Sequence, residues 1–98
     1  MKIVAAILCF CSLHGNAHTI RVGSQQPYQT IHTAIAAAKD RDTIIVAYGI
    51  YHEKNLIINK SIVLKGINHP VLDGENKYEI ISIKADNVIV DGFLLQHT

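Results

Sequence analysis

The chain has 98 residues, of which 49% are hydrophobic, and it carries nine Lys and Arg against eight Asp and Glu. This length allows one domain at most. The charge is nearly balanced and forms neither a basic stripe nor an acidic tail, so we expect no nucleic-acid partner.

The first 17 residues have the pattern of an export leader. Lys2 gives a basic start, and residues 3–13 form an apolar run that is too short to span a bilayer. Gly15 and Ala17 place small residues at positions −3 and −1 of a peptidase site, so we predict cleavage after Ala17. The alternative is that this run forms a buried first strand or helix.

Both cysteines, Cys9 and Cys11, lie inside the predicted leader. Leu8 and Phe10 precede them, whereas a lipoprotein acceptor cysteine needs a small residue there, so lipidation is the weaker interpretation. Loss of Lys2 with the leader leaves eight basic and eight acidic residues in residues 18–98. We therefore expect an exported domain that is neutral, has no disulfide and has no membrane span after leader removal.

One helix is predicted, after a short strand at residues 19–22 and a loop at residues 23–27. Within residues 28–39, four apolar side chains recur at the i, i+3, i+4 and i+7 spacing of one helix face. Thr30 is the predicted N-cap, and Lys39 is expected to interact favourably with the negative, C-terminal end of the helix dipole. The apolar face consists of Ile31, Ala34, Ile35 and Ala38.

After the helix, the sequence consists of short apolar runs separated by polar or glycine corners. Residues 43–47 form a continuous apolar strand, which is typical of a parallel sheet. Residues 48–51 are expected to turn the chain, and residues 56–58 to form another strand. Three triplets then end at glycine corners, and residues 79–83 lie between the second and the third. The triplets are residues 62–64, 71–72 with Asp73, and 88–90.

The spacing of these runs favours a coil over a hairpin sheet. Residues 61–66 match residues 87–92 at an offset of 26, and residues 43–46 match residues 61–64 at an offset of 18. These values bracket the length of one solenoid turn. A hairpin would need alternating strands on both sides of the Asp-Gly pairs, and the segments that follow them lack that pattern.

We therefore predict that the glycines act as bends, in which left-handed backbone geometry lets the chain turn to the next face. The predicted helix would close the first turn, whose backbone edge is otherwise unpaired. The structural turn residues in this prediction are Gly49, Gly66, Asp73, Gly74, Asp91 and Gly92.

The residues from Thr30 to Gly74 resemble the opening of right-handed parallel β-helix proteins of the pectin-lyase-like superfamily. The segments INKSIVLKG (58–66), PVLDG (70–74) and ADNVIVDGF (85–93) are most similar to the NosD family. The resemblance implies an all-β, right-handed, single-stranded parallel β-helix with an N-terminal capping α-helix. Residues 18–98 would be its cap and first coils. Because the last coil would expose an unpaired backbone edge, we expect an N-terminal fragment of a longer protein, and we expect the isolated fragment to be marginally stable and to self-associate.

The resemblance also implies a function. NosD proteins are periplasmic accessory proteins that work with an ABC transporter to supply the copper-sulfur centre of nitrous oxide reductase. Transporter subunits and the reductase are thus the implied partners, and copper is an implied cofactor of the full-length protein but not of these residues. Two alternatives stay open: a carbohydrate-active β-helix enzyme (pectin methylesterase or polysaccharide lyase), and a structural surface solenoid.

Metal-binding and catalytic residues are sparse in the predicted mature chain. No two of its histidines are spaced two or four residues apart, and no cysteine or methionine lies near them. His18 is the metal candidate, because its imidazole and the new α-amine could chelate an ion, although an amino-terminal copper site usually needs His at the second or third position. We find no triad, phosphate loop or zinc spacing, and expect no catalytic residue here.

The remaining polar candidates have structural explanations. Asp73 and Asp91 each precede glycine, and their side chains are expected to accept hydrogen bonds from the backbone of the turn that they start. Asn59 and Asn87 are expected at corners where side-chain amides can bond along a β-ladder. Paired acidic residues that bind Ca²⁺ or act as acid and base would instead favour an enzyme.

Overall fold

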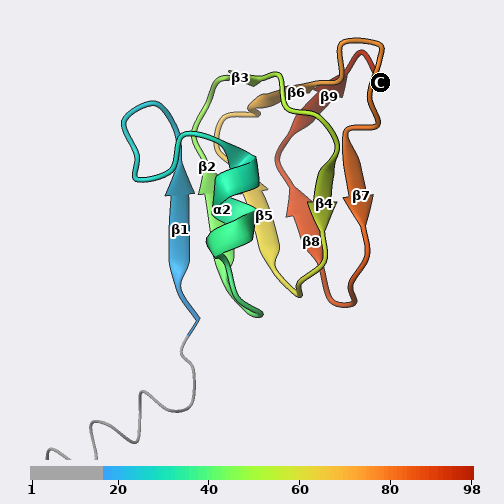
Figure 1. The fold of residues 1–98 in the computed structure, drawn as a ribbon. Coiled ribbons are helices and arrows are strands. Elements are labelled where there is room, and N and C mark those ends of the chain that lie inside the picture. The colour runs from blue at the N-terminus through green and yellow to red at the C-terminus, as the bar shows by residue number, and fades with distance from the viewer. Residues whose placement is uncertain (1–16) are drawn as a thin grey trace, which may run out of the picture.

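The structure is a computed structural model that describes residues 17–98, so all of the predicted leader except Ala17 lies outside the described residues. Short strands and one helix follow one another along the chain (Figure 1). In order they are β1 (Thr19–Val22), α2 (Ile31–Ala37), β2 (Thr43–Val46), β3 (Ile50–Tyr51), β4 (Leu56–Ile58), β5 (Val63–Gly66), β6 (Val71–Asp73), β7 (Ile81–Ile83), β8 (Ile89–Asp91) and β9 (Leu94–Gln96).

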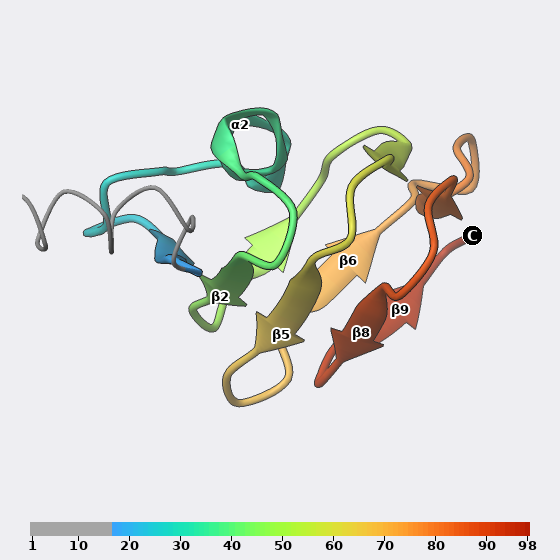
Figure 2. The ribbon, with the colours of Figure 1, turned by 90° about the horizontal axis from the view of Figure 1, so that it is seen from below.

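All strand pairs are parallel, and they form three sheets in the orders β1-β2-β5-β8, β3-β6-β9 and β4-β7. The chain visits the three sheets in turn and stacks each visit on the previous one, giving a parallel β-helix of about three turns. Figure 2 shows the successive turns advancing away from α2. The predicted all-β parallel β-helix is therefore confirmed. The right-handed sense predicted for it is the one that parallel crossovers nearly always adopt.

The register corrects one of the two predicted offsets. Lys65 pairs with Asp91, at the predicted offset of 26, but Thr43 pairs with Val63, at an offset of 20 instead of 18. Ile62 and Leu64 both point into the core and are fully buried. Because side chains alternate with a period of two, offsets of 18 and 20 place the same side chains inward, and the hydrophobic pattern cannot distinguish them.

Residues 48–51 were expected only to turn the chain, but Ile50–Tyr51 forms β3, which pairs with β6 and is the first strand of the second sheet. A two-residue strand carries too little alternation to be recognised in a sequence. It is recognised as a strand only from its backbone pairing in the structure, where β6 pairs with β3 and β9 pairs with β6.

The core is a set of inward-pointing ladders that run along the coil axis. In the first sheet one ladder contains Ile20, Ile44, Leu64 and Val90, which are matched residue by residue. Ile44 and Leu64 are fully buried, and Ile20 and Val90 pack against the buried cluster. Burying each such side chain contributes about 1.5–3 kcal/mol of hydrophobic free energy, which makes these ladders the main stabilising feature of the coil.

Helix α2 covers the interior at the start of the coil, where it contacts β1, β2 and β4. The predicted face is correct: Ile31, Ala34, Ile35 and Ala38 are all buried. Thr30 is the N-cap, as predicted, and its Oγ1 accepts the Thr33 N–H at 3.2 Å. Lys39 lies beyond the helix end, and the last turn of α2 has no basic residue of its own. The expectation that Lys39 interacts with the dipole there is wrong, and another lysine has that role.

The glycine corners differ from their predicted geometry. Among the described glycines, only Gly92 has a positive φ, of 84°. Gly66 is a strand residue stacked on Gly92: a Cβ on Gly66 would lie 2.6 Å from the Gly92 carbonyl oxygen and 2.6 Å from Pro70 Cδ. A Cβ on Gly74 would likewise lie 2.6 Å from the His97 carbonyl oxygen. Close approach of stacked backbones therefore requires glycine at Gly66 and Gly74.

Left-handed geometry occurs instead at non-glycine corners. The residues with φ between 56° and 79° are Arg41, Asn68, His69, Glu75, Asn76, Asn87 and His97. Asparagine tolerates this region better than most residues, which gives Asn68, Asn76 and Asn87 a backbone role at their corners.

Candidate functional site

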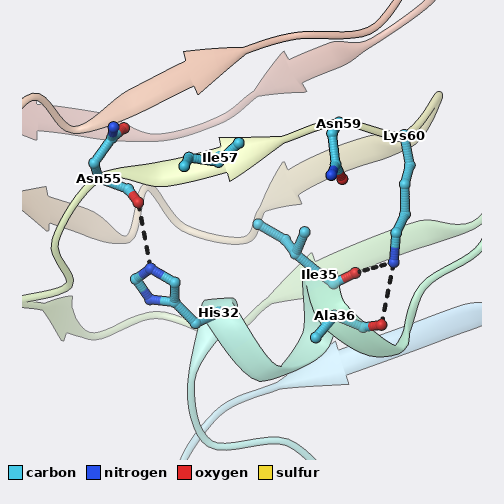
Figure 3. A pocket seen from close by; sticks show the side chains of 7 residues that line it. All are labelled: His32, Ile35, Ala36, Asn55, Ile57, Asn59 and Lys60. Atoms are coloured by element: carbon cyan, nitrogen blue, oxygen red, sulfur yellow. Dashed lines mark hydrogen bonds between the residues drawn. The ribbon is translucent and has the colours of Figure 1, made fainter.

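Helix α2 and strand β4 form the walls of an open groove of about 410 Å³ (Figure 3). The groove floor is apolar, with Ile35 and Ala36 on the helix side and Ile57 on the strand side. Ile57 points outward and is 46% exposed. The polar residues at its rim are His32, Asn55, Asn59 and Lys60.

A carboxylate from the next turn of the coil holds the first turn of α2. The two oxygens of Glu53 accept the backbone N–H groups of Ile31 at 2.8 Å and His32 at 2.9 Å. The His32 ring contributes as well, because Nδ1 lies 2.7 Å from Glu53 Oε1 and Nε2 lies 3.3 Å from the Asn55 carbonyl oxygen. Glu53 thus satisfies two helix N–H groups that have no partner in the helix, and places negative charge at the positive end of the dipole.

Lys60 has the complementary role at the other end of α2 (Figure 3). Its Nζ donates to the carbonyl oxygens of Ile35 at 2.7 Å, Ala36 at 3.1 Å and Ala38 at 2.6 Å. These carbonyls lie at the C-terminal end of the helix, where Ile35 also accepts the Ala38 N–H at 3.2 Å and the helix offers Ala36 and Ala38 no N–H partner. Glu53 and Lys60, which we call the helix clamp, therefore hold α2 at both ends from the corners that flank β4.

The sequence prediction missed the helix clamp. Lys60 belongs to the INKSI segment and Glu53 follows the Gly49-Ile50-Tyr51 run, so both residues lie within the part of the chain that carries the resemblance. One signal was available in the sequence. Glu53 and Lys60 are seven residues apart and flank a three-residue strand, so an acidic and a basic side chain are separated by about the length of a short helix.

The predicted metal candidate His18 lies against Asp42, a buried residue that is 4% exposed. The His18 backbone N–H donates to Asp42 Oδ1 at 2.9 Å, and the His18 ring Nδ1 lies 3.8 Å from the same oxygen. The Lys39 N–H donates to Asp42 Oδ2 at 2.9 Å. Burial raises the pKa of Asp42, but the two backbone donors and the charges of His18 and Lys39 outweigh it, so the pKa is lowered overall.

Asp73 is the centre of a second polar cluster, at the corner after β6. Its Oδ1 accepts the Glu75 N–H at 2.8 Å and lies 3.0 Å from Nδ1 of His97. On the other side, Nδ1 of His52 lies 3.7 Å from Asp73 Oδ2 and 3.2 Å from Glu75 Oε2. The hydrogen bond from Glu75 is the largest cause of the lowered pKa of Asp73, and burial opposes it. Asp73 is thus an ionised turn residue flanked by two imidazoles.

The lowered pKa values of Asp42 and Asp73 predict how stability depends on pH. Because each carboxyl binds a proton less readily in the folded chain, each stabilises the fold above the ordinary aspartate pKa of about 3.9. That stabilisation is lost as the pH falls through the lower, folded-state pKa. We expect Asp73→Asn to reduce the slope of unfolding free energy against pH between about pH 5 and 2.

Chemical denaturation at a series of pH values measures this slope. Asp86→Asn, which removes a carboxylate with an exposed side chain, is the matched control and should leave the slope closer to that of the parent chain. An unchanged slope in Asp73→Asn would contradict the assignment.

The other predicted site residues are spread along the coil. Asp91 ends β8, is exposed, and lies opposite Lys65 in the parallel pairing of β5 with β8. Gly49 precedes β3, and its carbonyl oxygen accepts the Val71 N–H at 2.8 Å. Asn59 lies one residue beyond the Ile58–Ile83 pair, and so level with Lys84, whereas Asn87 lies at the corner before β8. The two asparagines are therefore not stacked on each other.

A second groove, of about 290 Å³, lies on the outer face of the first sheet. Its most exposed aromatic side chain is Tyr48, at 66%. Arg21 and Asn68 add hydrogen-bonding groups, and Ile45 and Ile67 add apolar surface. An exposed ring beside polar groups is suited to stacking on a flat, partly polar ligand.

Within residues 17–98, His, Asp and Glu side chains nowhere come together in a group of three or more arranged to hold a metal ion. No helix in this part of the chain has the length and apolar character needed to span a membrane. Comparison of the chain with protein-family models, curated proteins and solved structures finds no match.

Proposed function

We propose that this chain contributes a rigid β-helix scaffold to an exported accessory protein of the NosD type, which assists assembly of the copper-sulfur centre of nitrous oxide reductase together with an ABC transporter. The observation that supports the proposal is that the residues carrying the resemblance are the residues that build the capped coil. Lys60 holds the end of α2, and Gly66 and Gly92 allow two turns to stack.

The role proposed for these coils is to present surfaces, and no bond-making step is assigned to them. Four of the charged side chains, namely those of Glu53, Lys60, Asp42 and Asp73, are occupied by hydrogen bonds to backbone groups. A catalytic acid or base must instead face a site where a substrate can sit. The outer sheet faces and the groove beside α2 remain accessible for a partner.

A complementation experiment tests this proposal. A nitrous-oxide-reducing host that lacks its own accessory gene would receive the full protein that contains this chain, and the visible absorption of the copper-sulfur centre in the purified reductase would be measured. We expect the absorption to return. Export of a folded protein without any return of that absorption would contradict the proposal, and detection of the protein in the periplasmic fraction distinguishes this outcome from failed export.

Carbohydrate binding is the second candidate function, and the groove at Tyr48 favours it. If a sugar ring stacks on Tyr48, Tyr48→Ala should weaken oligosaccharide binding by about fivefold, since an aromatic contact of this kind contributes roughly 1 kcal/mol. Calorimetric titration with pectic and other acidic oligosaccharides measures the change. Tyr78→Ala is the control, because Tyr78 lies beneath Lys54 near the corner after β6 and is not among the residues that line the groove.

A further inference from the structure

The backbone nitrogen of His18 has an unusual environment for a residue that is expected to become the first of the mature chain. It donates to Asp42 Oδ1 at 2.9 Å, and the Asp42 side chain is only 5% exposed. The His18 carbonyl oxygen accepts the Thr43 N–H at 2.9 Å. The residue is thus fixed on both sides, with its nitrogen held at a buried carboxylate.

We propose that leader removal after Ala17 creates an ion pair between the new α-ammonium group of His18 and the Asp42 carboxylate, and that this pair locks the start of β1 onto the coil. Hydrolysis consumes one water, leaves a carboxylate on Ala17 and leaves an amine on His18. At neutral pH the amine carries a proton and a positive charge. The bond from a neutral N–H to the carboxylate therefore becomes an ion pair between two charged groups, with no movement of the nitrogen.

The surroundings of Asp42 suit this role. The Lys39 N–H occupies Oδ2 at 2.9 Å, so the carboxylate is oriented with Oδ1 toward His18. The charged side chains that act on Asp42 are those of Lys39 and of His18 itself. Asp42 directly precedes β2, and β2 pairs with β1 from Thr19 to Val22. An ion pair at this position would strengthen the pairing of β1 with β2 at the start of the coil.

The ion pair should make the α-amine hold its proton more tightly in the folded chain. An opposite charge at this distance raises the pKa of an amine by roughly one unit or more above its ordinary value of about 7.7–8.0. The stabilisation is fully present below the ordinary value and is lost as the pH rises through the raised one. One unit corresponds to about a tenfold change in the folding equilibrium.

The experiment starts from the full chain, exported with its own leader, and determines its first residue by mass spectrometry. NMR titration of the His18 Hα signal then gives the α-amine pKa. We expect His18 to be the first residue, and its α-amine pKa to be raised in the parent chain and ordinary in Asp42→Asn. Asp40→Asn is the matched control, because Asp40 is the neighbouring carboxylate and accepts the Ser61 N–H at 2.9 Å.

A chain that begins at Ala17 provides an independent comparison if Asp42→Asn does not fold. Its ammonium group lies one residue earlier, so His18 keeps a neutral N–H, and we expect its folding equilibrium at pH 7 to be about tenfold weaker than that of the His18 chain. A mature chain that begins elsewhere, or an α-amine pKa within the ordinary range in the folded parent chain, would overturn the proposal.

Discussion

Gly92→Ala should lower the free energy of unfolding by about 3 kcal/mol or more, the largest effect expected of a single methyl group in this chain. The left-handed backbone at φ 84° costs an L residue roughly 1–2 kcal/mol. The added Cβ would also lie 2.5 Å from the Gly66 carbonyl oxygen, and overpacking of this kind typically costs about 1–3 kcal/mol. Urea denaturation followed by circular dichroism measures the loss.

Gly49→Ala is the matched control for this prediction. Gly49 does not have a positive φ, and a Cβ there would meet the Tyr51 ring at 3.4 Å, which is an ordinary contact. We expect a change within about 1 kcal/mol in either direction, because alanine also reduces the entropy of the unfolded chain. Equal losses in Gly92→Ala and Gly49→Ala would show that the stacked glycines do not limit the approach of the two turns.

Lys60→Met should cost about 2–3 kcal/mol and should loosen α2 before the rest of the coil unfolds. The substitution keeps a long apolar side chain but leaves the carbonyl oxygens of Ile35, Ala36 and Ala38 without their charged donor. Hydrogen bonds to charged groups contribute roughly 1.5–3 kcal/mol, and the helix dipole adds a few tenths. Hydrogen exchange should accelerate most at the Ala38 N–H, which bonds to Ala34 within the helix.

Lys84→Met removes an exposed lysine one turn further along the coil and is the control for the helix clamp. Glu53→Gln tests the other end of α2, where two backbone N–H groups share the carboxylate. Because both residues hold one short helix, we expect the double variant to lose less than the sum of the single losses. Additive losses, or unchanged exchange in Lys60→Met, would contradict the clamp.

The sequence was sufficient to predict the parallel coil because local signals and the global fold agree. Apolar runs without the alternation of hairpin strands, corners at intervals near one turn, and a small-residue helix face all indicate the same architecture. The face of α2 and its Thr30 cap were predicted correctly because both depend on residues within one helix turn of each other.

The errors concern relations between turns, which the local pattern does not contain. The offset between β2 and β5 could not be fixed, because Ile62 and Leu64 both point inward. The glycines were assigned a bend, yet Gly66 and Gly74 are needed because another turn passes within van der Waals distance. Lys60 and Glu53 bond to a helix more than twenty residues away, and Asp42 reaches back to His18. Such partners become neighbours only when the coil closes.

Within the described residues, the last strands of the second and third sheets, β9 and β7, differ from the strands on which they stack. Leu95 pairs with Leu72 and Ile83 pairs with Ile58, so both side chains continue inward ladders. Leu72 and Ile58 are buried, whereas Leu95 is 45% and Ile83 is 53% exposed. Each turn of a parallel coil therefore depends on its neighbour for burial, as expected of a repeat structure with nearest-neighbour coupling.

The most direct test of the parallel coil is the pattern of long-range NOEs across the first sheet in solution. The structure predicts contacts from Ile44 to Leu64 and from Leu64 to Val90, with parallel connectivities on both sides of β5. Antiparallel connectivities between β2 and β5, or NOEs that place β5 beside β6 as a hairpin, would contradict the parallel coil and the functional proposal that depends on it.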